Sequence, residues 1–133
     1  MCVAGTRWVQ RDLLQKYSAA DLRVYAVWFN MVASDSRSKW PAGLLSDNRA
    51  IHRWDESKVV GRWFAGQTSG IRSQLAPGSA WGDGETLWDA YLLYGADARW
   101  DDGPTGLIRW GRTIVAGRET LKADFDKLFG PKK

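Results

Sequence analysis

A single thiol stands directly after the first residue of the chain. Cys2 is the only cysteine among 133 residues, and the run that follows it carries apolar side chains at helical spacing. At the start of a helix, the macrodipole and the unpaired backbone N–H groups stabilise a thiolate and lower its pKa from about 8.5. Arg7, about one turn further along, would favour the thiolate too. We interpret Cys2 as the candidate catalytic residue; the alternative is an ordinary exposed thiol near a chain end.

One thiol permits some redox chemistry and excludes the rest. A low-pKa cysteine can form mixed disulfides, become glutathionylated or react with peroxide. Without a second cysteine, Cys2 can neither form an intramolecular disulfide nor resolve its own mixed disulfide, and every multi-cysteine zinc motif is excluded. The chemistry to expect is that of a single thiol with a partner molecule.

Polar residues after the first expected strand form a candidate substrate site. The segment "ASDSR" follows a run of β-branched and aromatic residues, and open α/β sheets bind ligands at the carboxyl ends of their strands. Asp35 and Arg37 could orient a substrate there, with Trp40 at the rim, or could pair with each other. The alternative is that they are ordinary turn residues.

Two further titratable residues need an explanation. His52 is the only histidine, and with Asp55 or Glu56 it offers two ligands, which do not make a metal site. We therefore expect a structural or surface histidine, no metal and no other cofactor. Asp89 lies in an otherwise apolar strand, where a buried carboxylate needs a partner. Arg109 or Arg112 on the neighbouring strand could supply it.

The first half of the chain predicts a helix, two strands and a second helix. Apolar spacing indicates a helix over 3–17. The nearly continuous β-branched and aromatic run over 22–32 indicates a strand covered on both faces, and 49–54 is short enough for a strand. Asp55 or Ser57 would cap the next helix. The apolar residues of that helix are Val59, Val60, Trp63 and Phe64.

After a Gly-, Ser- and Pro-rich excursion over 66–84, the chain predicts a hairpin and a closing helix. The runs 86–95 and 106–115 are strand candidates joined by turn residues, which favours an antiparallel hairpin. An amphipathic helix follows and is ended by Gly130 and Pro131. Its apolar side consists of Leu121, Phe125, Leu128 and Phe129. This order indicates an α/β sandwich with a mixed sheet.

Composition and charge bound the class of protein. By length the chain is a single domain, 1–133, and its 44% of hydrophobic residues is ordinary for a globular protein. The net charge of +4 comes from interspersed residues without a basic cluster, so we expect no nucleic-acid partner. No apolar run is long enough to cross a bilayer and no signal peptide is visible, so we expect no membrane association and a cytoplasmic protein. The nine tryptophans could form a binding surface, but packing is the more usual role.

Four stretches of the chain resemble a bacterial branch of the thioredoxin-like superfamily. They are "VYAVWFNMVASDSR", "HRWDESKVVGRWFA", "LWDAYLLYGADARW" and "IRWGRTIVAGRETLKADF". The resemblance covers the chain from Cys2 onward and implies a thioredoxin-like sandwich, with a mixed central sheet and flanking helices. In that superfamily a strand leads into a Cys-x-x-Cys motif that opens the first long helix. Cys2 stands where this motif meets the helix.

The chain departs from the superfamily pattern in three ways. The strand before the motif, which would lie between the strands matching 23–31 and 86–94, is missing, so the resemblance implies an N-terminally truncated fold. If Cys2 is the first cysteine of the motif, its partner position holds Gly5; if it is the second, the first is missing. The cis-proline that normally precedes the strand facing the active site is absent, since 84–87 reads Gly-Glu-Thr-Leu.

The resemblance implies a redox or thiol-handling protein with an incomplete, single-cysteine site, weak or inactive in dithiol exchange. Its partner would be a protein or a small thiol. The alternative is a non-catalytic, Trp-rich protein-interaction module on the same scaffold. Sheet edges left unpaired by the missing strand would also favour a homodimer, formed by strand pairing or exchange.

Overall fold

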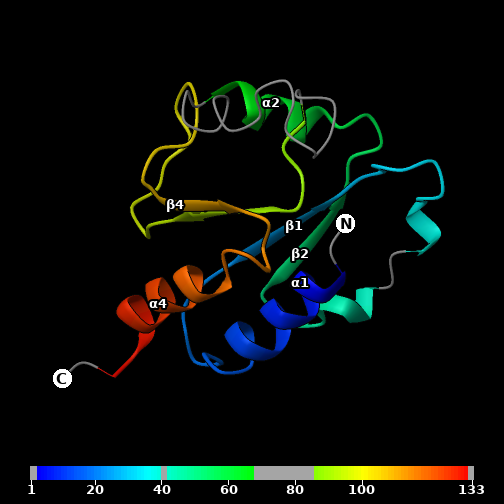
Figure 1. Ribbon diagram of the computed structural model, residues 1–133. Helices are drawn as coiled ribbons and strands as arrows, with labels where there is room; N and C mark the ends of the chain where they lie inside the picture. The colour runs from blue at the N-terminus through cyan, green and yellow to red at the C-terminus, as the bar shows by residue number, and fades with distance from the viewer. Residues whose placement is uncertain (1–2, 40–41, 68–85, 132–133) are drawn as a thin grey trace.

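Two pairs of β-strands form the centre of this α/β fold (Figure 1). β1 (Val24–Trp28) and β2 (Ala50–Trp54) run parallel to each other. β3 (Ala90–Tyr94) and β4 (Leu107–Arg112) form an antiparallel hairpin, which confirms the prediction for this part of the chain. The computed structural model describes residues 3–39, 42–67 and 86–131.

The two strand pairs are separate sheets, so the expectation of one mixed central sheet is wrong for the described residues. The strand expected over 22–32 is limited to β1, because β2, its one neighbour in the described part, has five residues, and a strand extends only as far as its ladder. The edge of β1 that faces away from β2 has no strand beside it within the described ranges. The same holds for the edge of β3 that faces away from β4.

Helices cover the strands from two sides (Figure 1). α1 (Val3–Trp8) continues directly into a π-helical segment, η1 (Val9–Leu14), so the helix expected over 3–17 is present but ends earlier. α4 (Arg118–Phe129) lies on the same side as α1, and α2 (Val59–Gln67) lies on the other. The order of helices and strands therefore agrees with the α/β class.

The connection from β1 to β2 contains two single-turn 3-10 helices. They are η2 (Arg37–Lys39) and η3 (Ala42–Leu45). No helix within the described ranges is long and apolar enough to cross a membrane.

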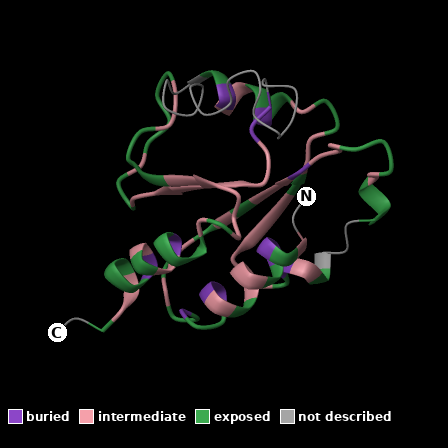
Figure 2. Cartoon of the chain, viewed as in Figure 1, coloured by how far each residue is buried: buried purple, intermediate pink, exposed green. Residues whose placement is uncertain are grey.

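The larger buried cluster joins the first and last helical segments (Figure 2). Its buried members are Leu13, Tyr17, Leu121 and Phe125. The ring centroids of Tyr17 and Phe125 are 5.7 Å apart, and Phe129 continues the stripe of α4 at a spacing of four residues. The amphipathic helix is thereby confirmed, except that Leu128 is 45% exposed. It stands beside this stripe and outside the cluster.

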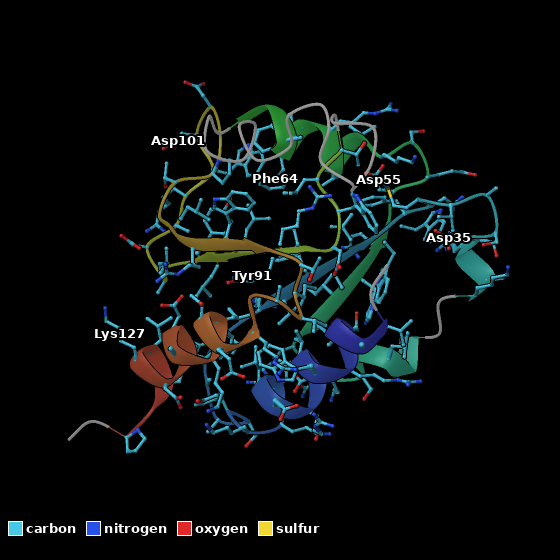
Figure 3. The ribbon with its side chains drawn as sticks, viewed as in Figure 1. Asp35, Asp55, Phe64, Tyr91, Asp101 and Lys127 are labelled. Atoms are coloured by element: carbon cyan, nitrogen blue, oxygen red, sulfur yellow. The ribbon has the colours of Figure 1, made fainter. Side chains whose placement is uncertain are left out.

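α2 begins where Asp55 accepts hydrogen bonds from its first backbone N–H groups (Figure 3). The carboxylate accepts from Val59 N–H at 3.0 Å and from Val60 N–H at 2.7 Å. These donors have no carbonyl partner within the helix, and a side-chain acceptor there is worth about 1 kcal/mol. Of the two predicted caps, Asp55 is the one that binds these N–H groups.

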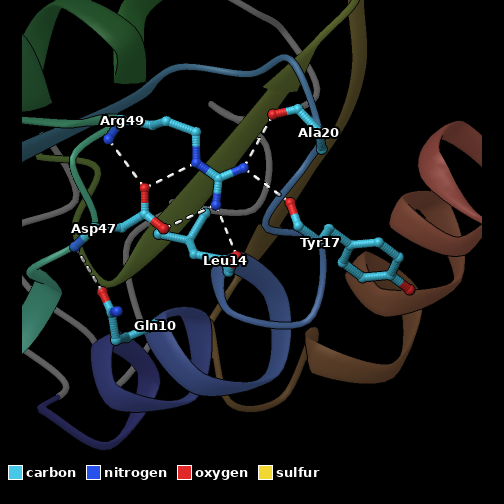
Figure 4. Close-up of polar contacts among 6 residues, drawn as sticks. All are labelled: Gln10, Leu14, Tyr17, Ala20, Asp47 and Arg49. Carbon is cyan, nitrogen blue, oxygen red and sulfur yellow. Dashed lines mark hydrogen bonds and ion pairs between the residues drawn. The ribbon is translucent and has the colours of Figure 1, made fainter.

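Arg49 connects the end of the first helical segment to the start of β2 (Figure 4). Its Nε and Nη2 groups each donate to one carboxylate oxygen of Asp47 at 2.8 Å. Nη1 donates to the carbonyl oxygens of Tyr17 at 2.8 Å and Ala20 at 3.0 Å. Nη2 donates to the Leu14 carbonyl oxygen at 2.7 Å. All five N–H donors of the guanidinium are therefore used.

Arg49, paired with Asp47, caps the C-terminal end of η1. The last carbonyl groups of a helix have no N–H partner, and a cation at that end complements the helix dipole. The Gln10 side-chain oxygen also accepts from Asp47 N–H at 3.1 Å, which attaches the segment before β2 to the helix a second time. The Arg49 and Asp47 side chains are only 15% and 13% exposed. Hydrogen bonds from Arg49 hold the pKa of the Asp47 carboxyl at about 2.

Asp47→Asn is expected to lower the free energy of unfolding at neutral pH by about 2 kcal/mol, since the pKa of the carboxyl falls from 3.8 to about 2 on folding. This stabilisation is fully present above the ordinary pKa and is lost as the pH falls from 3.8 toward about 2. Urea unfolding at a series of pH values measures it, and the difference between wild type and variant should shrink in acid.

The matched control for this prediction is Asp12→Asn. That substitution removes an exposed ion pair with Arg11 and should change the free energy of unfolding by less than about 0.5 kcal/mol. A difference between Asp47→Asn and wild type that stays constant across the acid range would contradict the stabilising role of the ionised Asp47.

Candidate functional site

Three segments meet at Gly61 of α2. A methyl group on Gly61 would stand 2.8 Å from Thr86 Cγ2, 2.9 Å from the Leu87 carbonyl oxygen and 3.2 Å from the Phe29 ring. The Leu87 N–H also donates to the Gly61 carbonyl oxygen at 3.0 Å. Glycine permits this close approach because it has no side chain. The residue after β1 and the segment before β3 therefore both contact α2.

Two buried oxygen atoms near this meeting point have no hydrogen-bond donor among the described residues. They are Asn30 Oδ1, one residue beyond Phe29, and Asp89 Oδ1, two residues beyond Leu87. Buried polar atoms almost always have a partner, and an unsatisfied one costs about 1–3 kcal/mol. We name the region of Phe29, Asn30, Gly61, Leu87 and Asp89 the β1–β3 edge and identify it as the candidate binding site. Its acceptors suit amide N–H, hydroxyl or thiol donors.

Asp89 combines an uncommon backbone conformation with an unfavourable charge. Its φ of 47° lies in the left-handed region, which aspartate tolerates better than most residues. Burial raises the pKa of its carboxyl, and a hydrogen bond from Ile114 N–H and the positive charge of Arg112 act in the opposite direction. Backbone strain and a disfavoured charge in one residue are typical of functional sites.

The ion pair expected for Asp89 is not formed in the described part of the chain. Arg109, one of its two predicted partners, instead donates to Asp124 of α4 at 2.7 and 3.1 Å, because it lies on the part of β4 that faces that helix. Arg112 acts on Asp89 through its charge only. The Arg112 guanidinium also lies 5.9 Å from the centre of the Trp88 ring.

Asp35 stabilises the turn that follows β1. Its Oδ2 accepts hydrogen bonds from Met31 N–H at 2.9 Å and Val32 N–H at 3.0 Å, and these bonds lower the pKa of the carboxyl. Figure 3 shows Asp35 on the loop that extends from the end of β1. Arg37 is exposed on η2, and within the described ranges no ion pair joins it to Asp35. Their part in orienting a substrate stays a prediction.

Cys2 and Trp40 lie outside the residues that the structure describes. Their roles as thiol and rim residue stay predictions. α1 begins at Val3, the residue that follows Cys2 in the sequence. Among the described residues, no group of histidine, cysteine and acidic side chains could hold a metal ion.

His52 is held between Trp28 and Leu45. The Trp28 indole N–H donates to His52 Nδ1 at 2.9 Å, and His52 Nε2 lies 2.9 Å from the Leu45 carbonyl oxygen. Because Nδ1 accepts a hydrogen bond, the proton of the neutral ring is on Nε2, which donates to that carbonyl. The two rings also stack, with centroids 5.8 Å apart and planes 7° from parallel. His52 is therefore a structural residue, as predicted.

Asn30 and Gly61 belong to the site but are not selected by reasoning from the sequence. Asn30 is an isolated amide near the end of an apolar run, which is a weak signal. Gly61 stands inside a helix, where glycine costs about 1 kcal/mol relative to alanine. A glycine tolerated at that cost indicates close approach of another segment, and this signal could have located the site.

Asp89→Asn is expected to raise the free energy of unfolding at neutral pH. Asparagine keeps an acceptor for Ile114 N–H and tolerates the positive φ, but it has no charge to desolvate. Because folding raises the pKa of Asp89, its contribution to wild-type stability is most favourable below 3.8 and declines as the pH rises through the raised pKa. The advantage of the variant, measured by urea unfolding, should grow from acid to neutral pH.

Asp124→Asn is the matched control and should show the opposite sign. Hydrogen bonds from Arg109 lower the pKa of Asp124, so removing its charge should destabilise the protein at neutral pH and have less effect in acid. An Asp89→Asn variant that is less stable than wild type at neutral pH would contradict the unfavourable charge at Asp89.

Comparison with known proteins adds no assignment to this geometry. The chain matches no protein-family model, no curated protein and no solved structure. Functional proposals therefore rest on its residues and their arrangement.

Proposed function

We propose that this chain is a thioredoxin-like, thiol-handling protein that binds a protein or a small thiol at the β1–β3 edge and reacts through Cys2. The arrangement of the elements supports the scaffold, since a parallel pair and an antiparallel hairpin have α1 and α4 on one side and α2 on the other. In the superfamily pattern a further strand lies between the strands that match β1 and β3. Each of these two strands has an edge without a neighbouring strand in the described part of the chain.

The unsatisfied oxygens of Asn30 and Asp89 carry the proposal. They lie just beyond the end of β1 and just before the start of β3, in segments that both contact α2. Both oxygens are buried, so the groups that cover them must move before a partner can donate N–H or S–H groups to them. Such a partner would remove a cost of about 1–3 kcal/mol at each oxygen. That gain favours binding at the β1–β3 edge over binding elsewhere.

With one cysteine, the reaction ends at a mixed disulfide. The Cys2 thiolate attacks one sulfur of a partner disulfide, a new S–S bond to Cys2 forms, and the other partner sulfur leaves as a thiolate. Release requires a thiol from another molecule, because the chain has no second cysteine. We therefore expect slow or absent dithiol exchange.

A non-catalytic interaction module on the same scaffold is the second candidate. Its support is an exposed aromatic surface: Trp100 is 65% exposed and stacks on Trp63 with ring centroids 5.0 Å apart. Exposed tryptophans are enriched where proteins bind partners. In this case Cys2 would be dispensable.

The rate at which iodoacetamide alkylates Cys2, measured against pH, separates the two candidates. If Cys2 is a functional thiol, the midpoint for the folded protein should lie well below the value of about 8.5 expected for urea-unfolded protein. Oxidised glutathione should then form an adduct that mass spectrometry detects, more slowly in Asn30→Ala and not at all in Cys2→Ser. Lys127→Ala, an exposed change on α4 and outside the β1–β3 edge, is the control for Asn30→Ala. Identical midpoints would contradict the thiol function and favour the interaction module.

We also propose that the unpaired edge of β1 promotes self-association through strand pairing. Val24 N–H and the Trp28 carbonyl bond toward β2, so by alternation the backbone groups of Tyr25 face the unpaired edge. Light scattering should show a dimer fraction that grows with concentration and decreases in Tyr25→Pro, which removes a donor from that edge. Ala26→Pro is the contrasting variant, because it breaks the bonds to β2 and should unfold the sheet. A monomer at every concentration would contradict the proposal.

A further inference from the structure

Trp100 is exposed on a loop whose backbone is held by several hydrogen bonds. It is 65% exposed and lies between β3 and β4, whereas none of the other tryptophans in the described ranges is exposed. The loop is closed by backbone bonds from Gly95 N–H to the Gly106 carbonyl and from Thr105 N–H to the Arg99 carbonyl. Thr105 Oγ1 additionally accepts from Arg99 N–H at 3.1 Å. These bonds keep a large apolar ring in contact with water.

The inner face of Trp100 is covered by α2. Its ring stacks on Trp63 with centroids 5.0 Å apart and planes 27° from parallel. Trp63 in turn meets Phe64 edge to face at 4.9 Å. The three rings form an aromatic shelf, which we name the Trp100 shelf, and its open side is the outer face of Trp100.

Carboxylates dominate the charge of the loop that carries Trp100, and α2 adds one exposed positive charge, Arg62, next to Trp63 in the sequence. Residues 95–106 contain three aspartates and one arginine, a local charge of −2, although the whole chain carries +4. Asp101 and Asp102 directly follow Trp100, are exposed, and form no ion pair with any described residue. Figure 3 shows Asp101 extending outward from the tip of the loop. The guanidinium of Arg99 binds the carbonyls of Asp97 and Ala98 instead.

We propose that the Trp100 shelf binds an arginine side chain of a protein partner. The guanidinium would stack on the outer face of Trp100 while Asp101 or Asp102 accepts its N–H groups. A planar, weakly hydrated cation satisfies both halves of this surface, since it is attracted to the ring face and forms paired hydrogen bonds with carboxylates. A lysine would supply the charge without the stacking plane. This binding site is independent of the proposed thiol function.

Titration with a short arginine-containing peptide, followed by NMR of the tryptophan indole N–H signals, tests the proposal. The Trp100 signal should shift on adding the peptide, and the same peptide with citrulline in place of arginine should bind at least about 5-fold more weakly, because citrulline keeps the planar shape without the charge. The combined change Asp101→Asn and Asp102→Asn should weaken binding of the arginine peptide by a similar factor. This variant leaves the aromatic packing intact, so its result does not depend on the folding of Trp100→Ala.

The controls separate this site from other exposed aromatics and from the thiol. Tyr25→Ala removes an aromatic side chain that is also 65% exposed, but on β1, and should leave binding unchanged. Cys2→Ser should also leave it unchanged, so the thiol function can fail while this site stands. Equal binding of the citrulline peptide, or no shift of the Trp100 signal with the arginine peptide, would overturn the proposal.

Discussion

Arg49 uses every donor of its guanidinium to join segments that share no backbone ladder. Three of its bonds go to carbonyls at and beyond the end of η1, and two go to Asp47 immediately before β2. The position of β2 follows from this attachment, and the parallel register with β2 decides where β1 ends. Phe29 and Asn30 reach the β1–β3 edge because β1 ends there. Lysine could not replace this arginine, since one ammonium group cannot bind a carboxylate in bidentate fashion and three separate carbonyls at once.

The unsatisfied oxygens and the strained backbone of the β1–β3 edge persist because local contacts hold its segments in place. Asp55 fixes the start of α2, and the close approach at Gly61 fixes the segments on both sides. Two buried oxygens without donors in the described part of the chain, and a strained Asp89, persist only when their surroundings leave no alternative conformation. The same constraints hold the acceptors in place, and because both oxygens are buried, a partner reaches them only after neighbouring groups move.

The sequence predicts features that depend on neighbouring residues and misses those that depend on distant ones. The hairpin, the closing helix and the cap at Asp55 follow from periodicity and spacing. The division into two sheets does not follow from periodicity and spacing, because it depends on whether β1 and β3 pair with each other. The role of Arg49 is equally hidden, since three of its acceptors are backbone carbonyls that any residue type supplies. Arg109 illustrates the same limit, because its true partner is on α4 and not on the adjacent strand.

The separation of the two sheets has a consequence for how the protein responds to temperature. One half of the described chain carries β1 and β2, and the other carries β3, β4 and α4. Hydrogen bonds from Leu87 N–H to the Gly61 carbonyl and from Lys16 and Tyr17 to Asp126 join them. Apolar side chains supply the rest of the contact described here, with Leu13 and Tyr17 against Leu121 and Phe125. Attraction between apolar groups weakens on cooling. Cold should therefore loosen the contact between the halves before it melts either ladder, so that each half moves as a body while its own strands stay paired.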